Sequence, residues 1–400
     1  MSPLTSILHA IAHITLVLVW SIGSCIPWNH QAVVLSPQTA THNATSTEKA
    51  RSYTTPSSPI TLPPLSATSS ISMLGASTSK QVSIHSPFKP SGILSQATTT
   101  VPATQLPIST QKVSYRDPEA VNAELRQGLV NILCTTKGGG YFRPITGSGV
   151  FISSQGVILT NAHVAQYFLL KDYLTQDNVD CVIRTGSPAS AEYRAEILYI
   201  PPAWIQANAH QLKGGEAVGS GEDDYAFLLV TSRTNDAALP ASFPSILLST
   251  ETPTLGDPVV LDSYPAQFLG GTEIQLNLYA SAAVSTVQKL YTFSSTTKTI
   301  DAVSLGSPIV AQSGSSGGPV ARLSDGAVFG IISTATEGTT TGSRELRAIT
   351  LSHIDRSLAK YGEGGFIPFL TNGDIVAKAT DFDANVAPGL TKLLEDALRN

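Results

Sequence analysis

The stretch GSGVFISSQGVILTNAHV, residues 147–164, indicates the fold class of this chain. Two short apolar runs rich in β-branched and aromatic residues flank a polar Ser-Ser-Gln-Gly turn, which is the pattern of paired β-strands. The second run leads directly to His163. A general base must be held rigidly, and the end of a buried strand does this. The stretch therefore predicts a β-sheet and a candidate base.

Segments of the same kind continue along the chain from residue 129 to residue 351. They alternate with Gly, Pro, Ser and Asn turns, and include VNILCTT (130–136), DCVIRT (180–185), YAFLLVT (225–231), IQLNLYAS (274–281) and AVFGIIS (327–333). This pattern favours an antiparallel sandwich or barrel over a regular alternation of strands and helices. A helix is expected to begin at Asp117-Pro118, and two more are expected at 352–361 and 388–398.

Two further motifs carry side chains that suit acyl transfer. In GEDDYAFLLV (221–230) an acid precedes a strongly apolar run. A buried carboxylate is costly unless it is paired, and an imidazole N–H would pair it. In AQSGSSGGPV (311–320) the Gly and Ser residues predict a tight turn with exposed backbone N–H groups. Two such donors aimed at a developing oxyanion are worth about 3–4 kcal/mol each.

The three motifs, in the order His, Asp, Ser, resemble the chymotrypsin/trypsin-like serine protease family. The blocks GSGVFI, GVILTNAHV and GSSGGPV are most similar to its HtrA/Deg-type branch. The resemblance implies an all-β fold with two Greek-key barrels, about 129–235 and 245–362, followed by a C-terminal helix. It also implies a serine endopeptidase that acts on proteins or peptides and needs no metal or cofactor.

The resemblance assigns a role to each matching residue. His163 is the general base and Ser316 the nucleophile. Asp224 orients the base in preference to Asp223, because the family pattern is Asp-x-Ala followed by apolar residues. The N–H groups of Gly314 and Ser316 form the oxyanion hole. An insertion between His163 and Asp224, which includes residues 199–205, is expected to be a surface loop.

The chain departs from the family pattern in three places. Ser315 stands before the nucleophile where the family has Asp or Asn, so activation by an ion pair with a newly cut N-terminus is not expected. Val310 stands at the base of the specificity pocket, with Ser333 in its wall strand, which favours cleavage after neutral or apolar residues. The residues after the second barrel are too few for a PDZ domain.

The N-terminal quarter of the sequence differs in composition from the rest. Residues 1–25 contain a short apolar run and end in Ile-Gly-Ser-Cys, which fits a signal peptide or a membrane or lipid anchor with Cys25 as the lipidation site. Residues 26–116 are rich in Ser, Thr and Pro and are expected to be a disordered linker. The protease domain is placed at 117–365 and a tail with a short helix at 366–400. We therefore expect an extracytoplasmic location, in which the chain is either secreted or associated with the membrane through the N-terminus.

The cysteines and the net charge limit the remaining functional classes. Cys134 and Cys181 both fall in the first barrel and are expected to form a disulfide in an oxidising compartment; two small buried hydrophobic residues are the alternative. The cysteines lack metal-ligand spacing. A net charge of −5 and a pI near 5.9 argue against nucleic-acid binding. The sequence does not define an oligomeric state.

Two other functions are compatible with parts of the sequence. Residues 314–318 also fit G-x-S-x-G, the nucleophile elbow of α/β-hydrolases, which would require Asp325 and His353 as partners of the serine. The β-rich pattern argues against that fold. The second alternative is a catalytically weak or inactive protease fold that serves as a surface binding protein.

Overall fold

Six strands of the domain form a closed antiparallel barrel. The computed structural model describes residues 114–137, 144–213, 220–296, 298–335 and 344–399. Within them the barrel order is β1-β2-β3-β6-β5-β4. Its strands are β1 (Leu129–Thr136), β2 (Ile145–Phe151), β3 (Val157–Thr160), β4 (Val179–Thr185), β5 (Ser190–Tyr199) and β6 (Ala226–Arg233). The proposed signal or anchor, Cys25 and the linker up to residue 113 lie outside the described residues.

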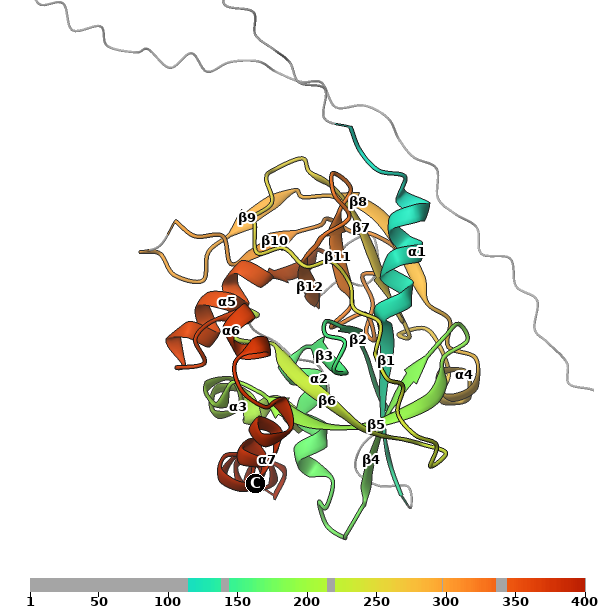
Figure 1. Ribbon diagram of the computed structural model, residues 1–400, viewed down its shortest axis with the longest axis vertical. Coiled ribbons are helices and arrows are strands. Elements are labelled where there is room, and N and C mark those ends of the chain that lie inside the picture. The colour runs from blue at the N-terminus through green and yellow to red at the C-terminus, as the bar shows by residue number, and fades with distance from the viewer. Residues whose placement is uncertain (1–113, 138–143, 214–219, 297, 336–343, 400) are drawn as a thin grey trace, which may run out of the picture. The chain divides into compact units, whose positions relative to one another are not determined.

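A second antiparallel sheet follows in the chain and lies above the barrel in Figure 1. Its order is β8-β7-β11-β12-β13-β10-β9. The strands are β7 (Pro258–Ser263), β8 (Ser281–Thr286), β9 (Lys289–Tyr291), β10 (Ala302–Ser304), β11 (Pro319–Arg322), β12 (Val328–Ala335) and β13 (Leu346–Thr350). The predicted all-β fold is confirmed. The second sheet differs from the prediction in that it stays open among the described residues.

Helices connect and flank the sheets. They are α1 (Pro118–Gly128), α2 (Ala162–Ala165), η1 (Gln166–Leu170), α3 (Pro202–Asn208), η2 (Ala209–Lys213), α4 (Gly271–Leu276), α5 (Leu351–Lys360), α6 (Phe366–Thr371), α7 (Ile375–Asn385) and α8 (Ala387–Arg399). The helix start expected at Asp117-Pro118 is confirmed, with the Asp117 carboxylate accepting from the Glu119 N–H. None of the helices in the described ranges is long and apolar enough to span a membrane.

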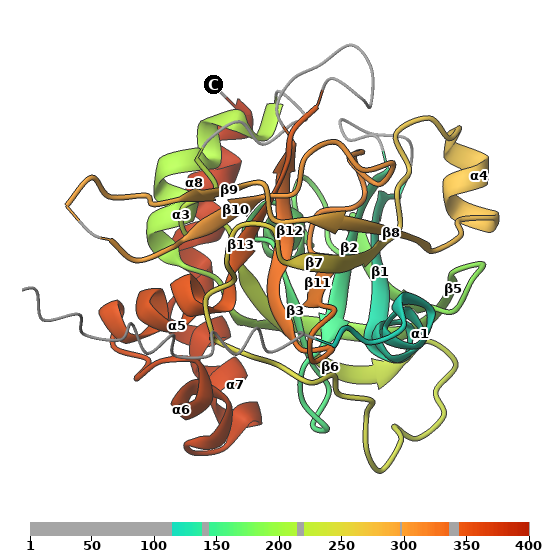
Figure 2. The ribbon, with the colours of Figure 1, turned by 90° about the horizontal axis from the view of Figure 1, so that it is seen from above.

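The C-terminal segment is not the tail with one short helix that the sequence suggested. After α5, the helices α6, α7 and α8 pack against the outside of the first barrel (Figures 1 and 2). Phe227 of β6 contacts Phe369 and Phe366, with ring centroids 4.8 and 5.9 Å apart. Alternate residues of a strand face opposite sides, and Leu228 is also fully buried. The apolar run of β6 is therefore explained by burial on both faces.

Two local predictions were wrong. The insertion after β5 is not a surface loop but helix α3, whose Trp204 and Ile205 are buried in the barrel cluster. Figure 2 shows α3 beside α8, far away in the sequence, and the two helices are in contact. The segment IQLNLYAS, expected to be a strand, instead contains the end of α4, and β8 begins only at Ser281.

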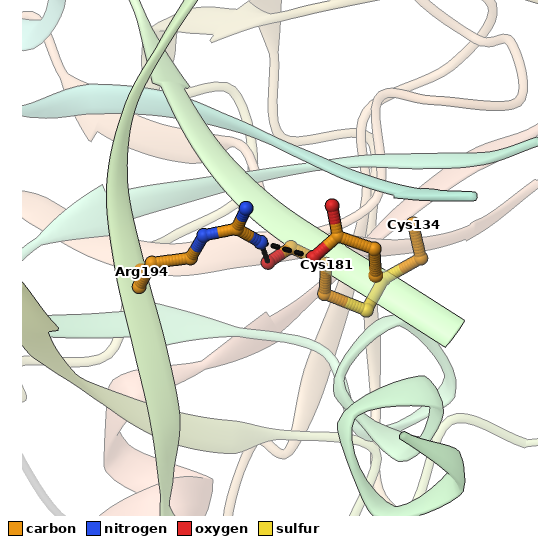
Figure 3. Close-up of a disulfide and its surroundings, with 4 residues drawn as sticks. Cys134, Cys181 and Arg194 are labelled. Atoms are coloured by element: carbon orange, nitrogen blue, oxygen red, sulfur yellow. Dashed lines mark hydrogen bonds and ion pairs between the residues drawn. A yellow bond between two sulfur atoms is a disulfide. The ribbon is translucent and has the colours of Figure 1, made fainter. Parts of the chain in front are cut away.

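A disulfide joins the first and last strands of the barrel order. Cys134 of β1 and Cys181 of β4 lie directly opposite each other in the strand pairing and are bonded, with an S–S distance of 2.01 Å (Figure 3). Arg194 of β5 donates to the Cys181 carbonyl (3.4 Å) and pairs with Asp180. The bond thus ties together the β1–β4 seam that closes the barrel.

Removing this disulfide is expected to destabilise the domain. The bridge closes a loop with a sequence separation of 47 residues, and opening that loop in the unfolded chain should lower the free energy of unfolding by about 3–4 kcal/mol. The test is urea unfolding of Cys134→Ala, Cys181→Ala and the double variant. All three should lose a similar amount, because one cysteine alone cannot form the bond. An unchanged unfolding midpoint in the double variant would contradict the prediction.

Candidate active site

His163 lies where β3 gives way to helix α2, at the edge of the barrel. Its backbone N–H donates to Asp224 Oδ1 (3.0 Å), and its ring Nδ1 lies 2.9 Å from Asp224 Oδ2. The side chain of Asn161 also holds Asp224, since its Nδ2 donates to the Asp224 carbonyl (2.8 Å). Backbone and ring of His163 are therefore both held by one acid.

Asp224 lies just before β6 and is only 2% exposed. Besides its two contacts with His163, its Oδ2 accepts from the Ser333 hydroxyl at 2.9 Å. A buried carboxylate is tolerated when its oxygens are paired in this way. The carboxylate is thus fixed against His163 by a side chain of β12 in the second sheet.

Ser316 lies in the turn before β11, and Ser333 links it to Asp224. Its Oγ donates to the carbonyl of Ser333 (3.2 Å), the residue whose own hydroxyl bonds Asp224. Its carbonyl accepts from the Ser148 N–H of β2 (2.7 Å). The contacts of His163 and Ser316 therefore meet at Asp224 and Ser333, between the two sheets.

The turn around Ser316 depends on two glycines in the left-handed region. Gly314 has φ +95° and Gly317 has φ +87°. A Cβ on Gly317 would come within 2.0 Å of the Ser148 carbonyl oxygen, and one on Gly314 within 2.5 Å of the Tyr264 carbonyl oxygen. Both positions thus require glycine for conformation and for space. The turn is held close to the first barrel as a result.

Two backbone donors in this turn are available. Within the described part of the chain, the N–H groups of Gly314 and Ser316 have no hydrogen-bond acceptor, whereas the neighbouring N–H of Ser315 donates to the Gln312 carbonyl (3.2 Å). The Gly314 carbonyl is fixed by the Ser148 hydroxyl (2.8 Å), which also accepts from the Tyr264 N–H (2.9 Å). This arrangement leaves two N–H groups free to bind an oxyanion.

Ser315, the residue before the candidate nucleophile, is held by a neutral contact. It is fully buried, and its Oγ accepts from the Ser263 hydroxyl of β7 at 3.0 Å. A small hydroxyl pair thus occupies the position where the resembled family uses an acid. The turn is anchored without an ion pair at this residue.

The two residues predicted for the specificity pocket are both buried, and the pocket itself stays a prediction. Val310 is fully buried in the core cluster of the second sheet, while its neighbour Ile309 is 71% exposed. Ser333 directs its hydroxyl to Asp224. This contact of Ser333 was not predicted; the available signal was a polar residue at the end of the apolar run AVFGIIS. The hydroxyl of Ser148 gave no such signal, because its partners come from distant segments.

The remaining candidate residues are engaged with other partners. Asp223 accepts from Ser357 (2.6 Å) and Tyr361 (2.7 Å) rather than from His163. Asp325 pairs with Arg322, and His353 pairs with Asp301. The acid and the histidine that an α/β-hydrolase would need are therefore not paired with each other.

Comparison with known proteins gives a family match for part of the chain. Residues 147–331 match the family model of the trypsin-like peptidase domain. The crystal structure of the Rv3671c protease from M. tuberculosis, active form, is similar at 20% identity and a TM-score of 0.38, covering 65% of this chain and 95% of that chain. No curated protein matches the sequence. The matched region runs from β2 into β12 and includes His163, Asp224 and Ser316. Residues 147–331 thus match a trypsin-like peptidase domain, which supports serine peptidase activity for this chain.

Proposed function

We propose that this chain is an extracytoplasmic serine endopeptidase in which Ser316 is the nucleophile, His163 the general base and Asp224 the acid that orients it. One observation carries the proposal. Asp224 Oδ2 lies 2.9 Å from both His163 Nδ1 and Ser333 Oγ, and the carbonyl of Ser333 holds the hydroxyl of Ser316. Nucleophile, base and acid are thus gathered by one hydrogen-bonded group.

The chemistry follows from these positions. Ser316 Oγ attacks the peptide carbonyl carbon while its proton passes to His163 Nε2, for which the hydroxyl turns away from the Ser333 carbonyl. The oxyanion is bound by the N–H groups of Gly314 and Ser316. His163 then protonates the leaving amine, and an acyl ester remains on Ser316. Water, deprotonated by His163, attacks the carbonyl carbon of this ester. Ser316 Oγ then leaves and regains its proton from His163, which releases the acid product and restores the free enzyme.

Asp224 supports this cycle by fixing the ring. Its carboxylate accepts from the Nδ1–H of His163, so the neutral ring presents an unprotonated Nε2 to Ser316. When the ring gains a proton, the carboxylate stabilises the resulting imidazolium. The buried position of Asp224 strengthens this interaction, because little water competes for the oxygens.

We propose that the unprocessed chain is competent. The Ser315–Ser263 hydroxyl pair anchors the turn before Ser316, so formation of the oxyanion hole does not require a newly cut N-terminus. Cleavage after neutral or apolar residues is proposed as well, since apolar Val310 rather than an acid occupies the predicted base of the pocket. A digest of a peptide library would test this preference, and frequent cleavage after Arg or Lys would refute it.

The extracytoplasmic location is proposed on two grounds. The Cys134–Cys181 disulfide persists in oxidising compartments, and residues 1–25 fit a signal peptide or an anchor with Cys25 as its lipidation site. Fractionation of cells that produce the full chain, followed by alkylation of free thiols, tests the location. Recovery of a cytoplasmic protein with both barrel cysteines reduced would exclude it.

Covalent labelling tests the proposed nucleophile. The purified full chain, without proteolytic treatment, is incubated with a fluorophosphonate probe and digested, and the adduct is located by mass spectrometry. We expect one adduct, on Ser316, because only a serine activated by a base reacts with such probes at a useful rate. Heat-denatured chain is the control and should remain unlabelled.

Other results would point to other functions. An adduct only after removal of the N-terminal segment would refute the competence of the unprocessed chain. Absence of an adduct in the folded protein, before and after such removal, would favour the inactive surface binding protein. An adduct on a different serine would exclude the proposed site.

A further inference from the structure

Helix α5 and its C-terminal cap hold the residue that precedes Asp224. The Asp223 carboxylate accepts from the Ser357 hydroxyl (2.6 Å) and from the Tyr361 hydroxyl (2.7 Å), and His353 Nε2 lies 3.6 Å from it. Asp223 is only 7% exposed. Three side chains from the same helical segment thus surround one buried carboxylate, which we call the α5 clamp: Asp223, His353, Ser357 and Tyr361.

The charge of Asp223 is stabilised within this clamp. Burial alone would raise the pKa of Asp223, but the contacts from His353, Ser357 and Tyr361 outweigh it and lower the pKa to about 2. The same contact with Asp223 adds to burial in raising the pKa of Tyr361. Asp223 is therefore ionised and Tyr361 neutral at physiological pH, which is the state required for the Tyr361 hydroxyl to donate.

The backbone of Asp223 shows why such a clamp is needed. Its φ is +57°, in the left-handed region that non-glycine residues seldom occupy. It sits in a tight turn, where the Asp224 N–H donates to the Gly221 carbonyl (3.2 Å) and the Tyr225 N–H to the Asp223 carbonyl (2.9 Å). This turn sets the direction in which the Asp224 side chain leaves the backbone.

The other contacts of α5 tie it to the second sheet. His353 Nδ1 lies 3.1 Å from Asp301 Oδ1, and Arg356 Nη2 lies 2.5 Å from the same oxygen. Ser357 is shared, because its hydroxyl also lies 2.9 Å from the Tyr225 hydroxyl. The helix thereby bridges the residue before β10 and the turn before β6, which come from the two sheets that form the site.

We propose that Asp223 is a positioning residue for catalysis and that the α5 clamp, through its carboxylate, holds the 221–224 turn so that Asp224 meets His163. This inference rests on the proposed function, because it concerns the same site. Asp223 does not touch the reacting atoms. It acts through Asp224, whose two contacts with His163 require the turn to keep its conformation.

The test removes the clamp without altering the triad. Tyr361→Phe and Ser357→Ala, separately and together, are compared with the full wild-type chain. We expect the double variant to lose about tenfold in kcat with KM changed less than twofold, because a misplaced triad affects the chemical step more than substrate binding. Tyr291→Phe is the matched control, since it removes a similar Tyr–carboxylate bond to Glu345 (2.8 Å) away from the site.

A second readout does not depend on turnover. The proton between His163 Nδ1 and Asp224 should give a downfield signal in the proton NMR spectrum, identified by its loss in Asp224→Asn. We expect the signal to shift or broaden in the double clamp variant and to stay in place in Tyr291→Phe. Asp223→Asn, which keeps an acceptor oxygen and tolerates the left-handed conformation, should retain more of kcat and of the signal than Asp223→Ala.

The outcomes separate the two proposals. A wild-type chain that is active, with clamp variants that keep both kcat and the NMR signal, overturns the positioning role alone. A loss of kcat that follows only the folded fraction in thermal unfolding, with an unchanged signal, also overturns it. If the wild-type chain is inactive, the proposed function fails, and the NMR comparison still decides whether the clamp positions Asp224.

Discussion

Alanine at Ser316 or at His163 is expected to lower kcat by about 10⁶-fold, because each change removes the nucleophilic route. The two residues act as a unit, so the double variant Ser316→Ala/His163→Ala should be no slower than either single variant. The measurement is hydrolysis of the best peptide substrate by the full chain, followed over hours so that slow rates are detected.

Matched control variants show whether the loss of kcat is specific to Ser316 and His163. Ser324→Ala and His210→Ala replace an exposed serine and an exposed histidine away from the site and should leave kcat unchanged. Circular dichroism and the unfolding midpoint should show that all variants fold. Additive losses in the double variant, or a Ser316→Ala protein that still cleaves peptides, would mean that another group performs the reaction.

Asparagine at Asp224 is expected to lower kcat by about 10³–10⁴-fold while the fold is retained. The shape of the side chain is kept, but an amide NH₂ that faces His163 Nδ1 forces that nitrogen to act as acceptor. The ring then carries its proton on Nε2, where it can no longer take the proton of Ser316. The backbone N–H of His163, which donates to Asp224 Oδ1 at 3.0 Å, would keep the amide oxygen at that position and so turn the NH₂ group toward Nδ1.

Asp325→Asn is the matched control for this variant. Asp325 lies in the turn before β12, where it pairs with Arg322 (2.6 Å), and its substitution should leave kcat unchanged. The pair of variants also separates the trypsin-like mechanism from that of an α/β-hydrolase, which would use Asp325. Equal activity of Asp224→Asn and wild type would remove Asp224 from the mechanism.

Much of the fold could be predicted from local sequence. The β-rich runs with polar turns are short-range features, and the start of α1 follows from Asp117 and Pro118 at its first turn. Helices α6 and α7 were missed, and α4 was taken for part of a strand. Contacts with distant segments accompany these helices, such as the contact of Phe369 with Phe227. Local helix propensity carries no information about such contacts.

The candidate site was only partly predictable, for the same physical reason. The motifs named His163, Asp224 and Ser316 because the flanking residues of each define a strand end or a Gly-rich turn. Hydrogen-bond partners were harder to predict, because the Ser333 hydroxyl donates to an acid 109 positions earlier in the chain. The burial of Val310 in the core of the second sheet likewise depends on distant segments.

The sequence by itself determined the β-rich fold class, the order of the three motifs and the Gly-rich turn around Ser316. These depend on residues adjacent in the chain, whose backbone preferences and polarity pattern act locally. Only the tertiary structure decided the pairing of Asp224 with Ser333, the attachment of Asp223 to α5 and the covering of β6 by α6. Those contacts depend on how two sheets and a distant helical segment pack, and burial and hydrogen bonding select them only once the chain has folded.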